Sequence, residues 1–408
     1  MTLQGLRAIS PLAMQATWGA KRAGLALIVC LGAVSAALDP APARAETRCS
    51  QAIRVLVARP ARSTTLQIEG HRYRFEPSGD GVRVDGGTQV AHWRGGGTGL
   101  SAVGDVPVRG ILEVRSSGSG LVVINEVPLE EYVVGVLAAE IPSTWASAAL
   151  EAQAVASRTY ALHQVRAHRG RLYHVEADTQ SQVYAGAESP PSLREAVRDT
   201  RCQVLTHAGR PILAAFHSAS GGRTASAQEV WGQELAYLVS QEVSDEDDSP
   251  DTYWRAGITR TTLGRALAAE GHRTGDVSEA EVLARSQSGR VALIRFRGPE
   301  GEVRLSGREL RRALGEITLR STLFELRSDA EGYVFVGSGR GHGVGMSQWG
   351  ARGLAERGKD YESILSAFYP GTALVRWPGD PMRSASDGAR EVNTREEREV
   401  AIRREERR

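Results

Sequence analysis

Residues 126–162 decide the fold of this 408-residue chain, and they read EVPLEEYVVGVLAAEIPSTWASAALEAQAVASRTYAL. Pro128 suits the first turn of a helix, because its φ angle is already helical and it has no backbone N–H to satisfy. Pro142 cannot continue that helix and pushes Ile141 out of helical geometry. The pattern therefore predicts a first helix over about residues 128–141.

Glu140 stands at the end of an apolar stripe on this helix. Tyr132, Val136 and Glu140 recur every four residues, so they share one face. A carboxyl group in that place is partly desolvated, which raises its pKa and lets it donate a proton near neutral pH. The simpler alternative is that Glu140 ends an amphipathic helix and points into water. Glu130 lies off that face, so Glu130→Gln is expected to leave any activity within a few-fold.

An alanine-rich second helix is predicted from near Trp145 to about Val165. Small residues on successive turns let another element approach closely. The polar exceptions are Gln153, Arg158 and Tyr160, which pattern alone would place at the surface or at the edge of a partly buried helix.

A glycine-rich motif occupies residues 339–372 and reads GRGHGVGMSQWGARGLAERGKDYESILSAFYPGT. With the two-helix stretch, in this order, it resembles the signatures of the stage II sporulation protein D (SpoIID) family. The resemblance covers about residues 52–376. It implies a lytic transglycosylase with Glu140 as the catalytic acid.

The same resemblance implies a set of residues that line the substrate cleft. Aromatic members can stack on sugar faces, as Trp349 also can, and polar members can bond acetamido and hydroxyl groups. A single histidine at a strand end is otherwise more often structural. The implied substrate-binding residues are Gln153, Arg158, Tyr160, Gln182, Tyr184, His217, Ser220, Gly221, Gly222, His342, Gly343 and Gln348.

Metal binding is not expected here. Sporulation members of the family carry Cys and His in the loop after the second helix, where they can hold zinc. In this chain residues 177–182 read ADTQSQ, without a Cys or His. No H-E-x-x-H motif occurs either, which disfavours a zinc hydrolase. We therefore expect no metal and no cofactor.

The implied chemistry needs one carboxyl group. A lytic transglycosylase breaks the bond between N-acetylmuramic acid and N-acetylglucosamine, and the muramic 6-hydroxyl closes on C1 to give a 1,6-anhydro end. Ordinary glycosidases use two carboxylates, so the lack of an obvious second one is consistent with this reading. The alternative is a non-catalytic wall-binding enhancer of a cell-wall amidase, which would not need Glu140. The expected partners are peptidoglycan glycan strands and an amidase or another envelope protein.

The N-terminus predicts export to the cell envelope. Lys21 and Arg22 precede an apolar run at residues 23–38, and Ala43-Arg44-Ala45 fits a cleavage site. The alternative is an uncleaved N-terminal anchor, the one membrane attachment expected. The formal charge of +2 gives no sign of nucleic-acid binding. Cys49 and Cys202 are predicted to form a disulfide, as an exported chain permits.

These patterns predict an α+β protein, with a β-rich N-terminal region, catalytic helices packed on a β-sheet, and an α+β insertion. A helix is expected at 278–285, and the acidic run 241–251 is expected to be a solvated loop. The expected parts are a signal peptide (1–45), the β-rich region (46–125), a catalytic core (126–255), the insertion (256–332), the C-terminal part of the core (333–378) and a charged tail (379–408).

Overall fold

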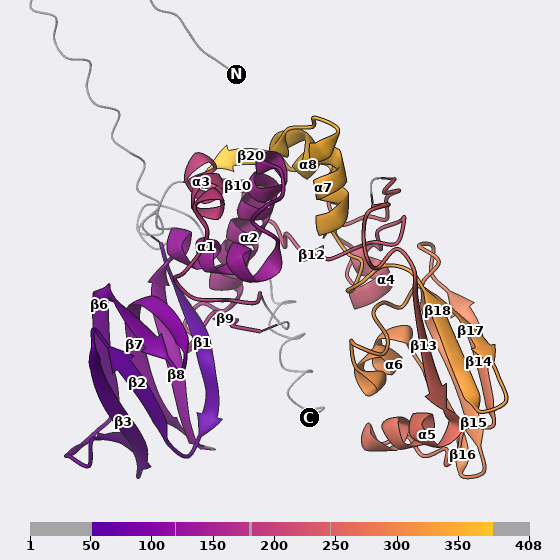
Figure 1. Ribbon diagram of the computed structural model, residues 1–408, viewed down its shortest axis with the longest axis horizontal. Helices are drawn as coiled ribbons and strands as arrows, with labels where there is room; N and C mark the ends of the chain where they lie inside the picture. The colour runs from indigo at the N-terminus through magenta and orange to yellow at the C-terminus, as the bar shows by residue number, and fades with distance from the viewer. Residues whose placement is uncertain (1–50, 119, 179–181, 245, 378–408) are drawn as a thin grey trace, which may run out of the picture. The chain divides into compact units, whose positions relative to one another are not determined.

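The computed structural model describes residues 51–118, 120–178, 182–244 and 246–377, and these form the α+β fold expected from the sequence (Figure 1). The predicted signal peptide, Cys49 and the charged tail lie outside the described residues.

A nine-stranded sheet contains all the strands that precede the first helix. Its strand order is β5-β4-β3-β2-β6-β7-β8-β1-β9, and only the short last strand runs parallel to its neighbour. Alternate residues such as Ile53, Val55, Leu112 and Val123 are fully buried beneath the helices, as the period of two predicts. The strands are β1 (Ala52–Ala61), β2 (Thr64–Ile68), β3 (His71–Ser78), β4 (Gly81–Val84), β5 (Gln89–Val90), β6 (His92–Val103), β7 (Val106–Ser117), β8 (Gly120–Pro128) and β9 (Val175–Glu176).

Helix α2 (Ser147–Ala167) is the centre of the fold, between two hydrophobic cores. Leu150, Ala154 and Leu162 belong to the core beneath the large sheet, which also contains α1 (Leu129–Glu140) and α3 (Pro191–Asp199). Ala152, Val155 and Ala156 belong to a second core formed with the C-terminal helices. The small alanines predicted from the sequence therefore let elements pack on both sides of α2.

The second core brings together segments far apart in the chain. Strand β10 pairs with β11 and with β20 near the end of the described chain, while β12 pairs in parallel with β19. The elements are β10 (Gln203–His207), β11 (Arg210–Pro211), β12 (Phe216–His217), α4 (Ala227–Trp231), β19 (Met346–Ser347), α7 (Gln348–Glu356), α8 (Tyr361–Phe368) and β20 (Ala373–Arg376).

Residues 254–337 form two three-stranded sheets, β13-β18-β17 and β14-β15-β16, around a third core. The helix predicted at 278–285 is wrong, because this segment is strand β14 and pairs with β15. Ala280 and Val282 pack on the core from alternate positions, which a helix could not allow. The elements are β13 (Trp254–Thr259), α5 (Arg260–Ala269), β14 (Glu279–Arg285), β15 (Val291–Gly298), β16 (Gly301–Leu305), α6 (Gly307–Leu314), β17 (Phe324–Ser328) and β18 (Gly332–Gly337).

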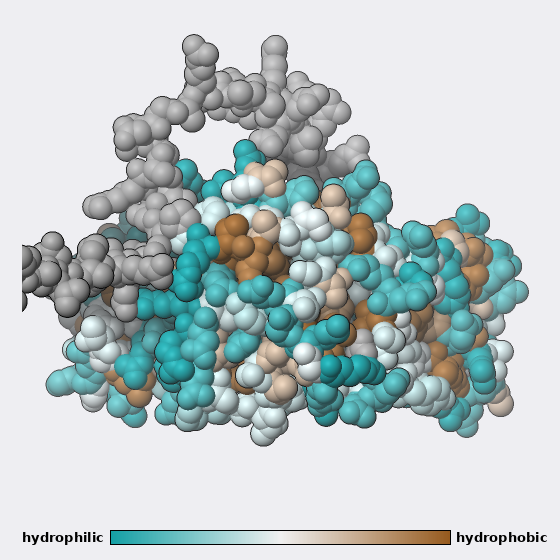
Figure 2. Space-filling model, turned by 90° about the horizontal axis from the view of Figure 1, so that it is seen from above, coloured by the Kyte–Doolittle hydropathy of each residue, from teal (hydrophilic) through white to brown (hydrophobic). Residues whose placement is uncertain are grey.

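The surface is predominantly hydrophilic on the face shown in Figure 2, where hydrophobic residues form separate small patches. Within the described ranges, no helix combines the length and the apolar character needed to cross a membrane.

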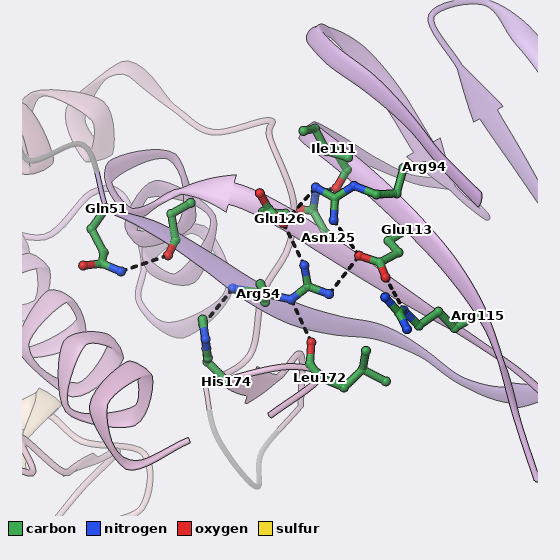
Figure 3. Close-up of polar contacts among 11 residues, drawn as sticks. Gln51, Arg54, Arg94, Ile111, Glu113, Arg115, Asn125, Glu126, Leu172 and His174 are labelled. Carbon is green, nitrogen blue, oxygen red and sulfur yellow. Dashed lines mark hydrogen bonds and ion pairs between the residues drawn. The ribbon is translucent and has the colours of Figure 1, made fainter. Parts of the chain in front are cut away.

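An ion cluster lies on the face of the large sheet away from the helices (Figure 3). Glu113 is fully buried and accepts hydrogen bonds from Arg54 at 2.8 Å, from Arg94 at 2.7 Å and from Arg115. Glu126 accepts from Arg54 at 2.8 Å and from Arg94 at 3.0 Å. Burial alone would raise the pKa of Glu113, but the bonds from Arg115 and Arg54 outweigh it and lower the pKa to about 2. The cluster thus ties β1, β6, β7 and β8 together without leaving a buried charge unpaired.

Candidate active site

Glu140 is half-buried at the C-terminal end of α1. The backbone N–H of Val183 donates to Oε1 at 3.0 Å, and the side-chain amide of Gln348 donates to Oε2 at 3.4 Å. Burial raises the pKa of Glu140, and these two hydrogen bonds offset part of that rise. The carboxyl group is therefore held from two sides by groups distant in sequence, and its protonated form is favoured relative to a carboxyl in water.

The segment that supplies Val183 is fixed against α1 by its neighbours. Tyr132 donates from its hydroxyl to Oε1 of Gln182 at 3.0 Å, and the ring of Tyr184 stacks on that of Tyr132 with centroids 5.4 Å apart. Gly135 makes this approach possible, because a Cβ there would lie 2.4 Å from the Tyr184 ring. Gln182 and Tyr184 are both buried. They position the Val183 N–H in this structure.

The three α2 residues that were expected in the cleft differ in their burial and in their partners. Arg158 is fully buried and makes a bidentate ion pair with Glu130, at 3.0 and 2.7 Å. Gln153 is also buried and donates to Ser157 at 3.1 Å. Tyr160 is half-buried against the core beneath the large sheet. Arg158 therefore exposes no surface to a ligand here, and it joins α2 to the start of α1 instead.

The turn at Ser220, Gly221 and Gly222 is built around a carboxylate from the same chain. Glu246 accepts from the backbone N–H groups of these three residues at 2.7, 2.8 and 3.2 Å, and also from the hydroxyls of Ser220 and Ser347. Glycine suits the last two positions because their φ angles are +76° and +97°. Converging N–H groups of this kind bind anions, and here the anion is Glu246.

The expectation of a solvated loop at 241–251 is therefore wrong for part of it, since Glu246 and Asp251 are buried. A run of acidic residues gives no sign of which member is buried, because that depends on the distant N–H groups and cations that it meets.

His217 is buried and His342 is half-buried, and their ring centroids lie 5.6 Å apart. Burial, followed by the charge of Arg290, lowers the pKa of His217 to about 3, and burial beside His217 lowers the pKa of His342 to about 3. Both rings are thus neutral near neutral pH. Gly343 lets the Arg290 guanidinium approach, because a Cβ there would lie 2.4 Å from Nη2. His217 Nε2 has no hydrogen-bond partner among the described residues.

Of the twelve implied binding residues, Gln348 is the one with a hydrogen bond to Glu140 in the described part of the structure. His217 pairs with Ser347, the neighbour of Gln348, so β12 and β19 connect the histidine pair to this contact. The Val183 N–H was missed by sequence reasoning, because a backbone group carries no residue-type signal.

Two family models match parts of this chain. A family model described as "Stage II sporulation protein" matches residues 117–207, and one described as a domain of unknown function (DUF8618) matches residues 224–345. Stage II sporulation protein D of Bacillus subtilis is 31% identical over 62% of this chain and 75% of that protein. An uncharacterized protein of Brachyspira hyodysenteriae is 33% identical over 62% of this chain and 68% of that protein.

The chain belongs to the SpoIID family. The first matched region contains α1, α2 and Glu140, and the second contains the 254–337 sheets and His342. An amidase enhancer of Bacillus subtilis is also similar, at 28% identity over 60% of this chain, which spans 40% of that relative. In this SpoIID member, no three Cys, His, Asp or Glu side chains of the described residues gather as metal ligands would.

Proposed function

We propose that this protein is an exported lytic transglycosylase that cleaves the bond between N-acetylmuramic acid and N-acetylglucosamine in cell-wall peptidoglycan. The observation that carries the proposal is the setting of Glu140, a half-buried carboxyl group with a raised pKa, held by Val183 and Gln348. A carboxyl group with these properties suits general acid catalysis. The family relationship supports the substrate class.

The two carboxyl oxygens of Glu140 are not equivalent. Oε1 accepts the shorter bond, from the Val183 N–H, so it is the better carbonyl oxygen. Oε2 accepts only the longer bond from Gln348, and we assign the transferable proton to it. The Gln348 amide can turn its oxygen to that proton, so it orients the acid in both protonation states.

The reaction then needs no second carboxylate. Glu140 gives its proton to the glycosidic oxygen as the bond to muramic C1 breaks, and the leaving sugar keeps a hydroxyl. The muramic 6-hydroxyl attacks C1 and returns its proton to the Glu140 carboxylate. The enzyme is restored, no water is added, and the product carries a 1,6-anhydro end.

A second candidate function is favoured by one observation, the similarity to an amidase enhancer. In that case the protein would bind wall glycan and stimulate an amidase without cutting the strand. Cleavage of glycan by the purified protein separates the two functions.

The test is digestion of purified glycan strands, with and without stem peptides, followed by mass spectrometry of the new ends. The transglycosylase predicts ends about 18 mass units lighter than hydrolysed ends, because no water is added. Intact strands, together with faster cleavage by an added cell-wall amidase, would establish the enhancer instead.

A further inference from the structure

A pocket of about 230 Å³ lies beside α7, and we call it the Trp349 pocket. Its lining residue Trp349 directly follows Gln348, whose side-chain amide donates to Glu140. Its size is below the roughly 300–1,000 Å³ typical of drug-sized ligands, so it suits one small group such as a single sugar ring. Its lining residues are Asp247, Asp248, Trp349, Arg352, Gly353, Glu356 and Arg357.

Ring contacts support the apolar wall of the pocket. Trp349 meets Trp145 edge to face, with ring centroids 5.2 Å apart, and Trp145 lies in the connection that follows Glu140. The Arg352 guanidinium carbon lies 4.8 Å from the Trp349 ring centroid and 5.9 Å from that of Trp145. Such cation–π contacts hold both the ring and the guanidinium in place.

The polar wall offers both acceptors and donors. Arg352 donates from Nε to Glu356 at 2.7 Å and lies 3.6 Å from Asp248 through Nη2. These contacts orient its remaining N–H groups, and the exposed carboxylates of Asp247 and Asp248 can accept hydrogen bonds.

The charge of the lining favours an uncharged ligand. Among the described lining residues, three carboxylates face two guanidinium groups, a balance of one negative charge. N-acetylglucosamine is neutral, whereas N-acetylmuramic acid carries a lactyl carboxylate that such a lining would repel when it is free.

We propose that the Trp349 pocket binds an N-acetylglucosamine residue of the glycan strand, which makes it a specificity site beside Glu140. This inference rests on the proposed function for its substrate class. The C–H face of the sugar packs on Trp349, its hydroxyls donate to Asp247 and Asp248, and Arg352 donates to its acetamido oxygen. By accepting N-acetylglucosamine, the Trp349 pocket would determine which of the two alternating sugars lies on the Trp349 side of Glu140.

The experiment is a calorimetric titration of the Glu140→Gln protein with an oligomer of four N-acetylglucosamine residues. This ligand contains no muramic acid, and the variant lacks the acid, so binding is measured without cleavage. We expect Trp349→Ala, added to that protein, to weaken binding about tenfold or more. Asp248→Asn should weaken it roughly three- to tenfold, since the acceptor of that hydrogen bond loses its charge. Asp105→Asn, an exposed turn residue of the large sheet, is the matched control and should change nothing.

Unchanged binding in both Trp349→Ala and Asp248→Asn would overturn the pocket assignment, and the exposed Asp248 keeps this test valid even if Trp349→Ala unfolds. Tighter binding of an otherwise equal oligomer that carries free lactyl carboxylates would also overturn it. Failure of the proposed function has a different signature, namely pocket-dependent binding of the neutral oligomer by a wild-type protein that makes no anhydro ends.

Discussion

Glu140→Gln is the substitution that tests the active site most directly. Gln keeps the shape of the side chain and an acceptor for the Val183 N–H, which now lies 3.0 Å from Oε1. Its new NH₂ group faces Gln348, whose amide can turn to accept from it. The fold should therefore be retained while the transferable proton is lost.

The expected loss of activity is large. General acid–base assistance contributes roughly 10²–10⁴-fold, which is about 3–5.5 kcal/mol of activation free energy. We expect the upper part of this range or more, because the leaving group is a poor alkoxide when it is not protonated. The assay is the rate of release of anhydro-ended fragments, measured by mass spectrometry.

The stability of Glu140→Gln relative to wild type should increase as the pH rises. The folded-state pKa of Glu140 is raised above its ordinary value of 4.5, so its contribution to stability is complete below that value and is lost as pH rises through the folded-state pKa. Gln does not titrate. The melting temperature of Glu140→Gln relative to wild type should therefore increase from acid to neutral pH.

Glu130→Gln is not a suitable control, contrary to the expectation from the sequence, because Glu130 pairs with the buried Arg158. Glu188→Gln replaces it, since Glu188 is exposed and lies a few residues after Val183. Three results would refute the reasoning on Glu140. They are reducing muramic ends from wild type, a Glu140→Gln protein that cuts at the wild-type rate, and a loss of activity that simply follows unfolding.

Four further outcomes are expected. Glu130→Gln should destabilise the fold by roughly 3 kcal/mol, because it leaves a buried arginine without its counter-charge, and thermal melting will measure this. The pKa values of His217 and His342, about 3 in the folded protein, lie below their ordinary value of 6.5, so their contribution to stability is complete above pH 6.5 and is lost as pH falls toward 3. Each adds a slope of up to about 1.4 kcal/mol per pH unit, and urea unfolding at several pH values should show a shallower slope in His217→Gln. Cys202 is disulfide-bonded, and we predict Cys49 as its partner, so labelling of both thiols in the oxidised protein would contradict this. Activity should survive dialysis against a strong chelator, and restoration of lost activity by zinc would count against a metal-free site.

Local sequence patterns were sufficient where the cause of the structure is itself local. Pro128 and Pro142 flank α1, which lies within one residue at each end of the predicted range 128–141, because proline restricts the backbone of its own turn. The alanines of α2 indicated close packing. The error at 278–285 arose because a short segment can satisfy either period, and only pairing with β15 selects the strand.

The sequence by itself determined the family, the α+β class and Glu140 as the residue to examine, since these follow from motifs and periodicity that are read along the chain. Only the tertiary structure decided which charges are buried and what they meet. It paired Arg158 with Glu130, placed Glu246 among the N–H groups of the Ser220 turn, and brought Val183 and Gln348 to Glu140. The physical reason is that the free energy of a charged group depends on its solvation and its neighbours, and those neighbours come from segments up to 208 residues away.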